Sequence, residues 1–279
     1  VNKVLKSRVD ECAPFENVYT LALRGLHDRA MNASNNMSDR KEMLQEALMA
    51  QRQMLVDAIG KRAEDIPQAF TPYKEVLDVY DQGLELPDDV TIIWPDDNYG
   101  YMKRLSSPKE QKRSGRSGVY YHSSYLGKPH DHLWMNTTSP TLMYEELRKA
   151  YDLTADRIWL LNAGDIKSCE FAVDYFLTMA FDIDSFNFER AANYRTEWLC
   201  GMLGNDYRNE YQDVINSFYK LAFARKPEFM GWGYQWATDK HGRERNTDTD
   251  FSLANYREVD TRLAEYRRIG NMAEKILKA

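Results

Sequence analysis

The chain has 279 residues, of which 43% are hydrophobic, so it is long enough to bury a substantial core and is not a disordered protein. Its 37 Lys and Arg residues against 43 Asp and Glu residues leave a net charge of −6, which provides no positive surplus for binding nucleic acid or anionic membranes. No apolar run approaches the roughly 20 residues of a membrane span, and the 3 cysteines lack the CxxC spacing of a zinc site.

The first half of the chain alternates strand-like runs with helical stretches. The runs are short, nearly continuous in apolar character and rich in β-branched and aromatic residues, which is typical of strands buried on both faces. The stretches between them carry an apolar stripe at helical spacing. Alternating strands and helices predict an α/β fold with a parallel sheet. The runs lie at 18–23, 90–94, 118–121 and 157–161, and the helical stretches at 39–59, at 72–82 and from Pro140 onward.

From about Asp184 onward the chain shows only helical periodicity. Three helical stretches, at 186–203, 207–224 and 252–277, are separated by loops that contain glycine and polar residues. The sequence therefore predicts two domains, an α/β domain over residues 1–183 and a helical domain over residues 184–279.

Each predicted strand is followed by a polar cluster. Because the carboxyl ends of parallel strands share one edge of a sheet, we expect the four clusters to converge there. For any single cluster, helix capping or turn formation is the alternative interpretation. The clusters are Arg24, Gly25, His27 and Asp28; Asp96, Asp97, Asn98 and Tyr99; His122; and Asn162, Gly164 and Asp165.

The carboxylates in these clusters suit acid–base chemistry. Asp96 and Asp97 are adjacent, so on an extended backbone they point in opposite directions, and we expect at most one to face a pocket while the other anchors the loop. With Asp165 from another strand, two carboxylates could flank a bond, as hydrolysis of a glycosidic bond requires. His122 is a candidate proton donor or reader of hydroxyl groups, and a structural histidine is the alternative.

A metal site is a competing hypothesis. His130 and His132 have HxH spacing, and with His122 and Asp97 they would complete a zinc site of the kind found in barrel hydrolases. The HxH triplet follows a glycine and a proline that are typical of a loop, so the sequence favours metal-free chemistry.

A series of motifs in chain order resembles glycoside hydrolase family 115, from about Phe15 to about Trp236. One of them is Trp-Pro-Asp-Asp-Asn-Tyr-Gly-Tyr at 94–101, and the number of motifs in chain order carries the resemblance. Further motifs lie at Tyr19–Asp28, Gly118–His122, Tyr125–Asp131, Trp134–Thr138, Ile158–Asp165 and Arg225–Glu228.

The resemblance implies an inverting α-glucuronidase without a metal cofactor, which removes glucuronic or 4-O-methylglucuronic acid linked α-1,2 to xylose. It also implies a (β/α)8 barrel followed by a helical bundle. Since only about four βα units are found where a closed barrel has eight, the chain is expected to form a partial TIM-like barrel followed by an α-helical bundle region. The open sheet edges then need other segments of the full-length chain to cover them, so we expect little activity from these residues alone.

The same resemblance assigns candidate site residues. It places the family's paired acids at Asp96 and Asp97, one of which is the first candidate for a catalytic carboxylate. The candidates for its partner are Asp165, Glu145 and a residue outside these 279 residues. For Glu145, a solvent-facing helical residue is the alternative interpretation. Arg24 is the candidate clamp for the uronate carboxylate, with an ion pair to Asp28 as the alternative. The complete set of candidate substrate-binding residues is Arg24, His27, Asn98, Tyr99, Tyr121, His122 and Asn162.

The implied partners are glucuronoxylan or its oligosaccharides, the missing segments of the full-length chain and a second copy in a homodimer, with no nucleic acid and no membrane. A xylan-degrading enzyme of this kind is expected in the periplasm or outside a bacterial cell. A non-catalytic carbohydrate-binding or structural α/β module is the alternative function, followed by a zinc-dependent barrel hydrolase.

Overall fold

The structure is a computed structural model in which two compact units are distinguished. The first unit comprises Val1–Asp96, Met102–Tyr120 and Lys149–Leu160, and the second comprises Asp97–Tyr101, Tyr121–Arg148 and Leu161–Ala279. The domain boundary expected between residues 183 and 184 stays a prediction. The structure describes residues 2–25, 30–31, 36–124, 135–227, 230, 237–238, 240–241, 244–245 and 249–278.

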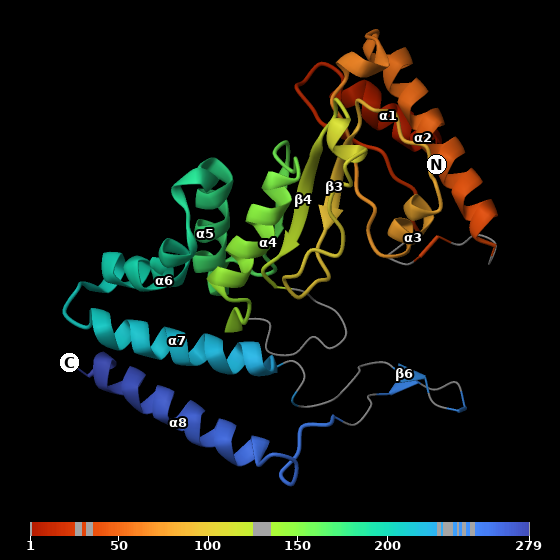
Figure 1. Ribbon diagram of the computed structural model, residues 1–279. Coiled ribbons are helices and arrows are strands. Elements are labelled where there is room, and N and C mark those ends of the chain that lie inside the picture. Colours follow the sequence, from red (N-terminus) through yellow and green to blue (C-terminus); the bar gives the residue numbers. More distant parts are fainter. Residues whose placement is uncertain are drawn as a thin grey trace. The chain divides into compact units, whose positions relative to one another are not determined.

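A five-stranded sheet with the order β1-β2-β3-β4-β5 forms the α/β part of the chain. The first four strands pair in parallel, and β3 and β4 lie side by side with Trp94 opposite Val119 (Figure 1). The order follows the sequence, as in the first strands of a (β/α)8 barrel. The predicted class, a partial barrel followed by helices, is confirmed. The strands are β1 (Tyr19–Thr20), β2 (Gln68–Phe70), β3 (Thr91–Pro95), β4 (Ser117–His122) and β5 (Trp159–Asn162).

Helices connect the strands and make up most of the chain after β5. Three-residue 3-10 helices lie at Ala63–Asp65, Glu110–Lys112, Ile166–Ser168 and Ile183–Ser185, and β6 (Ala237–Thr238) pairs antiparallel with β7 (Glu244–Arg245). The α-helices are α1 (Asn2–Cys12), α2 (Met37–Ile59), α3 (Glu75–Asp81), α4 (Pro140–Asp152), α5 (Glu170–Phe181), α6 (Phe188–Leu203), α7 (Arg208–Ala224) and α8 (Glu258–Leu277).

Helix α2 shows how the local sequence sets the fold of the first unit. The side chain of Asn36 caps its start by accepting a hydrogen bond from the backbone N–H of Ser38 at 3.0 Å. Gly60 ends it in a left-handed conformation, with φ of 71°. The face between these caps buries Leu44 and Leu48 in a core that also contains strand residues. Full burial of each leucine stabilises the unit by about 1.5–3 kcal/mol.

In the second unit, α7 and α8 lie side by side along their lengths (Figure 1). Arg262 of α8 donates to the backbone carbonyls of Leu221 at 3.0 Å and Arg225 at 2.7 Å, which satisfies carbonyls at the end of α7. The end of α7 is therefore fixed, and so is the start of the segment that follows it.

Besides the β6–β7 pair and the 3-10 helices, the structure adds β2, α1 and α5 to the predicted elements. Strand β2 has only three residues and follows Pro67, so it is too short to show an alternating pattern. Helices α1 and α5 also lie outside the predicted stretches, and α5 is apolar on several sides because five of its residues are buried. A helix without a single apolar stripe gives no clear periodic signal.

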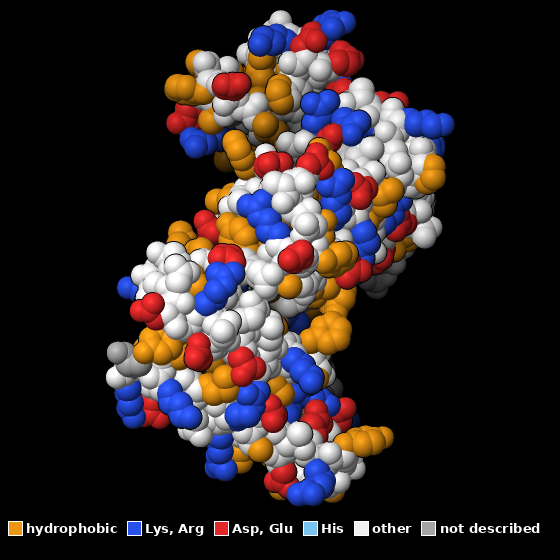
Figure 2. Space-filling model, turned by 60° about the vertical axis from the view of Figure 1, so that its left-hand side comes forward, with side chains coloured by type: hydrophobic (Ala, Val, Ile, Leu, Met, Phe, Trp, Pro, Cys, Tyr) orange, Lys and Arg blue, Asp and Glu red, His pale blue; other side chains and the backbone are white. Residues whose placement is uncertain are grey.

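Charged side chains of both signs are interspersed on the face shown in Figure 2, in keeping with the small net charge. Among the residues that the structure describes, no helix is both long and apolar enough to cross a membrane.

Candidate active site

A tight turn follows β3 and carries the paired acids. Asn98 and Gly100 adopt positive φ angles of 74° and 102°, which lets the backbone reverse direction. The backbone N–H of Asp97 donates to the carbonyl of Tyr101 at 2.7 Å. Oδ1 of Asp97 accepts hydrogen bonds from the backbone N–H groups of Tyr99 at 2.8 Å and Tyr101 at 3.1 Å. The Asp97 side chain therefore builds the turn, as Asp and Asn do at the first position of such turns.

The two adjacent acids have different surroundings. Asp96 is 1% exposed, and its backbone N–H donates to the carbonyl of Tyr120 at 3.1 Å. Asp97 is half-buried and uses Oδ1 in the turn, while no described residue donates a hydrogen bond to its Oδ2. Asp97 is thus the acid of the pair with an oxygen available to a ligand.

A residue at the end of β4 forms a hydrogen bond to this turn. Tyr121 is 0% exposed, and its hydroxyl donates to the carbonyl of Gly100 at 2.9 Å. Its ring stacks on Phe176 with centroids 6.3 Å apart. His122, the next residue, is 1% exposed. Both are buried in this structure, and their roles in substrate binding stay predictions.

The other acids predicted for the site, Asp165 and Glu145, are both exposed. Asp165 is exposed at the start of a 3-10 helix. The half-buried Asn162 accepts a hydrogen bond at its backbone carbonyl from the N–H of Ser123 at 3.0 Å. Glu145 lies on α4 and lines a pocket of about 540 Å³. That pocket shares Ser139, Leu142 and Phe223 with a smaller pocket that Asp97 lines, which keeps Glu145 a candidate for the partner carboxylate.

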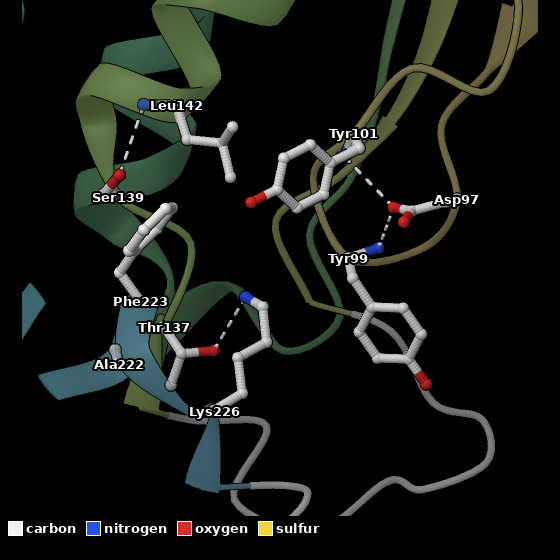
Figure 3. A pocket seen from close by; sticks show the side chains of 9 residues that line it. All are labelled: Asp97, Tyr99, Tyr101, Thr137, Ser139, Leu142, Ala222, Phe223 and Lys226. Atoms are coloured by element: carbon white, nitrogen blue, oxygen red, sulfur yellow. Dashed lines mark hydrogen bonds between the residues drawn. The ribbon is translucent and has the colours of Figure 1, made fainter.

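A pocket of about 320 Å³ lies beside the turn (Figure 3). Its volume falls at the lower end of the range for small-molecule sites. One wall is polar and comes from the turn and from the loop before α4, and the other is mainly apolar and comes from α4 and the end of α7. The lining residues are Asp97, Tyr99, Tyr101, Thr137, Ser139, Leu142, Ala222, Phe223 and Lys226.

Lys226 is the cation of this pocket. Its amino group points into the pocket and donates to the hydroxyls of Thr137 at 3.3 Å and Thr138 at 3.2 Å (Figure 3 draws the first of these bonds). The tyrosines of the turn bring aromatic faces to the same space, which suit stacking against a sugar ring. The pocket therefore combines a carboxylate, an ammonium and aromatic side chains.

Sequence reasoning found Asp97 and Tyr99 of this pocket but did not assign roles to Tyr101, Thr137 or Lys226. Tyr101 and Lys226 lie in motifs that carry the family resemblance, so only these motifs indicated that the two residues belong to the site. The polar clusters after the predicted strands do not include Lys226, because it comes from the helical part of the chain, 89 residues after Thr137.

Arg24, the predicted uronate clamp, lies in the other compact unit. Its Nε and Nη2 donate to the two carboxylate oxygens of Glu75 at 3.2 and 3.1 Å. Its guanidinium also lies 5.3 Å from the ring centroid of Tyr73. Glu75 thus already satisfies the bidentate geometry that would hold a substrate carboxylate. His27 and Asp28, the alternative ion-pair partner of Arg24, lie outside the described residues.

Within the described ranges, no group of three or more His, Cys, Asp or Glu residues is arranged to hold a metal ion. His130 and His132 of the zinc hypothesis lie outside those ranges.

Comparisons with known proteins identify relatives of the chain. The profile described as glycosyl hydrolase family 115 matches residues 1–229. The solved structure of BtGH115A, a family GH115 4-O-methyl-α-glucuronidase with specificity for decorated arabinogalactans, shares 38% identity at a TM-score of 0.85. The match covers 97% of this chain and 35% of BtGH115A, so the chain spans about a third of that protein.

A second solved structure, N-acetylneuraminate lyase from Proteus mirabilis, shares 12% identity over 96% of this chain and 92% of its own. Its TM-score of 0.27 is too low to support an argument. No curated protein matches the chain.

Proposed function

Because the chain belongs to glycosyl hydrolase family 115, we propose that its protein removes glucuronic or 4-O-methylglucuronic acid branches from a polysaccharide. One observation carries this proposal. The pocket beside β3 holds Asp97 in a fixed turn, with one carboxylate oxygen free of hydrogen bonds from described residues and with tyrosine rings beside it. An oriented carboxylate next to aromatic faces suits hydrolysis of a sugar.

The proposed reaction is hydrolysis with inversion. One carboxylate accepts a proton from water, the water oxygen bonds to C1 of the uronic acid, the glycosidic C–O bond breaks, and a carboxylic acid protonates the departing oxygen. We assign Asp97 to one of these roles and Glu145 or Asp165 to the other. Asp96 is the less favourable partner because it is buried. The anomer first released, followed by NMR, distinguishes inversion from retention.

Two polysaccharides are candidate substrates. The motifs favour glucuronoxylan with α-1,2-linked branches, whereas the related BtGH115A is described as specific for decorated arabinogalactans. Release of the uronic acid from both polymers, measured side by side, decides between them. Since such polymers lie outside cells, we also propose a periplasmic or extracellular location. Association as a homodimer stays a prediction.

The residue assignment is tested with Asp97→Asn in the full-length protein. Asparagine keeps the Oδ1 acceptor of the turn and removes the charge, so the fold is preserved while acid–base chemistry is lost. We expect turnover to fall at least about 100-fold. Asp57→Asn, an exposed substitution on α2, is the matched control and retains full activity.

Asp96→Asn is measured in the same series. If neither Asp97→Asn nor Asp96→Asn lowers turnover 100-fold, these acids are not catalytic. If the wild-type protein releases no uronic acid from either polymer, a non-catalytic carbohydrate-binding module is the better description. Activity that is lost with a chelator and restored by zinc would instead support the metal hypothesis.

A further inference from the structure

We propose that the pocket of about 540 Å³ holds neutral main-chain sugars of the polysaccharide, which stack on the rings of Phe188 and Phe223. This inference rests on the proposed function, because it names the part of the same substrate that carries the uronic acid. An enzyme that removes a branch must also accommodate the sugar to which the branch is attached. A site for the main chain is therefore required directly beside the site for the branch.

The larger pocket adjoins the smaller pocket that Asp97 lines. Ser139, Leu142 and Phe223 line both pockets, and they lie across the smaller pocket from Asp97 (Figure 3). In hydrolysis with inversion, the attacking water and the departing oxygen lie on opposite faces of C1. With Asp97 on the side of the water, the departing oxygen faces the shared wall. The main chain then continues into the larger pocket, which the candidate acid Glu145 also lines.

One face of α7 forms a wall of the larger pocket. Asn216, Tyr219, Lys220 and Phe223 line it, and their spacing of three, four and seven positions places them on the same side of the helix. The first residue of α6, Phe188, lines the same pocket. Each of the two helices thus contributes a phenylalanine ring to this space.

The two phenylalanine rings are accessible to a ligand. Phe223 is 73% exposed and Phe188 is 59% exposed. The ring of Phe188 packs edge-on against the ring of Tyr144, with centroids 5.2 Å apart, and this contact orients it. Flat aromatic faces suit stacking against the C–H face of a sugar ring, and a ring that is already oriented loses little entropy on binding.

The polar lining of the larger pocket suits neutral sugars. Its two charged residues, Glu145 and Lys220, have opposite signs, so the pocket has no excess charge that would favour an acidic ligand. Oδ1 of Asn216 accepts a hydrogen bond from Gln212 at 3.0 Å, which orients the amide and leaves its Nδ2 as a donor to sugar hydroxyls. Aromatic faces with a few placed polar groups are typical of a small-molecule site.

The test compares Phe188→Ala with wild type in the full-length protein. The substrates are glucuronic acid linked to a xylo-oligosaccharide, the same acid linked to a galacto-oligosaccharide, and its methyl α-glycoside. Phe188 lines only the larger pocket, so its loss should lower kcat/KM at least about 5-fold for the preferred oligosaccharide and leave the methyl glycoside unchanged. Phe188→Trp keeps a flat ring and should retain wild-type kcat/KM.

Phe181→Ala is the matched control. Phe181 is 93% exposed at the end of α5 and lines neither pocket, so its loss should change kcat/KM for none of the substrates. A general loss of stability in Phe188→Ala would lower activity on all substrates alike, whereas loss of a main-chain site changes only the ratio between oligosaccharide and methyl glycoside.

A second measurement does not depend on any variant. Wild-type protein should use one of the two oligosaccharides with at least about 5-fold higher kcat/KM than the methyl glycoside, and the preferred one identifies the main chain. Equal use of all three substrates by wild type, or an unchanged ratio in Phe188→Ala, overturns the main-chain site while leaving the hydrolase function standing. Absence of hydrolysis of every substrate by wild type would overturn the proposed function itself.

Discussion

Replacing Tyr121 with phenylalanine tests whether the buried end of β4 positions the turn that carries Asp97, the proposed catalytic acid. The hydroxyl of Tyr121 donates to the carbonyl of Gly100 at 2.9 Å, and the side chain is 0% exposed. Phenylalanine keeps the ring and its stacking on Phe176 but removes this donor. The substitution therefore removes the hydrogen bond to the turn.

The expected loss of stability follows from burial. Removing one partner of a buried hydrogen bond costs about 1–2 kcal/mol in the free energy of unfolding. For a chain of this size, each kcal/mol lowers Tm by about 2–4 °C. The turn also holds Asp97, and small misplacements of a catalytic group cost up to about 100-fold in rate. We therefore expect kcat of Tyr121→Phe to fall at least about 10-fold.

Tyr144→Phe is the matched control. Tyr144 is also buried and donates its hydroxyl to a backbone carbonyl, that of Phe186 at 3.2 Å, away from the turn. Both variants should lose similar stability in thermal unfolding, but only Tyr121→Phe should lose turnover at a temperature where both are folded. Equal turnover of the two variants would refute the idea that this bond positions Asp97.

Two further predictions concern the stability of the first unit. An added Cβ at Gly118 would lie 2.1 Å from the backbone oxygen of Ile158, so Gly118→Ala should destabilise the protein by about 3 kcal/mol in chemical denaturation. An added Cβ at Gly201 in α6 meets open space, so Gly201→Ala is the control and should not destabilise the protein. Burial alone would raise the pKa of Glu110, but hydrogen bonds, first of all from Ser107, outweigh it and lower the pKa below its usual value. A carboxylate with a lowered pKa stabilises the folded state above its unfolded-state pKa of about 4.3, and this stability is lost as pH falls through its folded-state pKa. Glu110→Gln should therefore reduce the unfolding free energy at pH 7, and that free energy should decline less steeply in acid than it does for wild type. Identical acid-unfolding curves for the variant and wild type would contradict this assignment.

The sequence predicted those parts of the fold that have strong local patterns. β3 and β4 were found because their residues form apolar, β-branched or aromatic runs, and α2 because its apolar residues recur at helical spacing. β2 was missed because three residues carry no period, and α5 because it is buried on several sides.

The site was predictable only where it depends on strand ends. Asp97 follows a strand, so parallel topology placed it at the sheet edge. Lys226 reaches the pocket through a contact between segments 89 residues apart, which no local pattern reveals. The ion pair of Arg24 likewise joins Glu75, 51 residues away, which no local pattern reveals.

The most direct test of the central claim is a crystal structure of the full-length protein with glucuronic acid bound. We predict that the sugar ring lies in the pocket that Asp97, Tyr99 and Tyr101 line. C1 should face Asp97. A sugar bound outside this pocket, for example with its carboxylate on Arg24, would contradict the account.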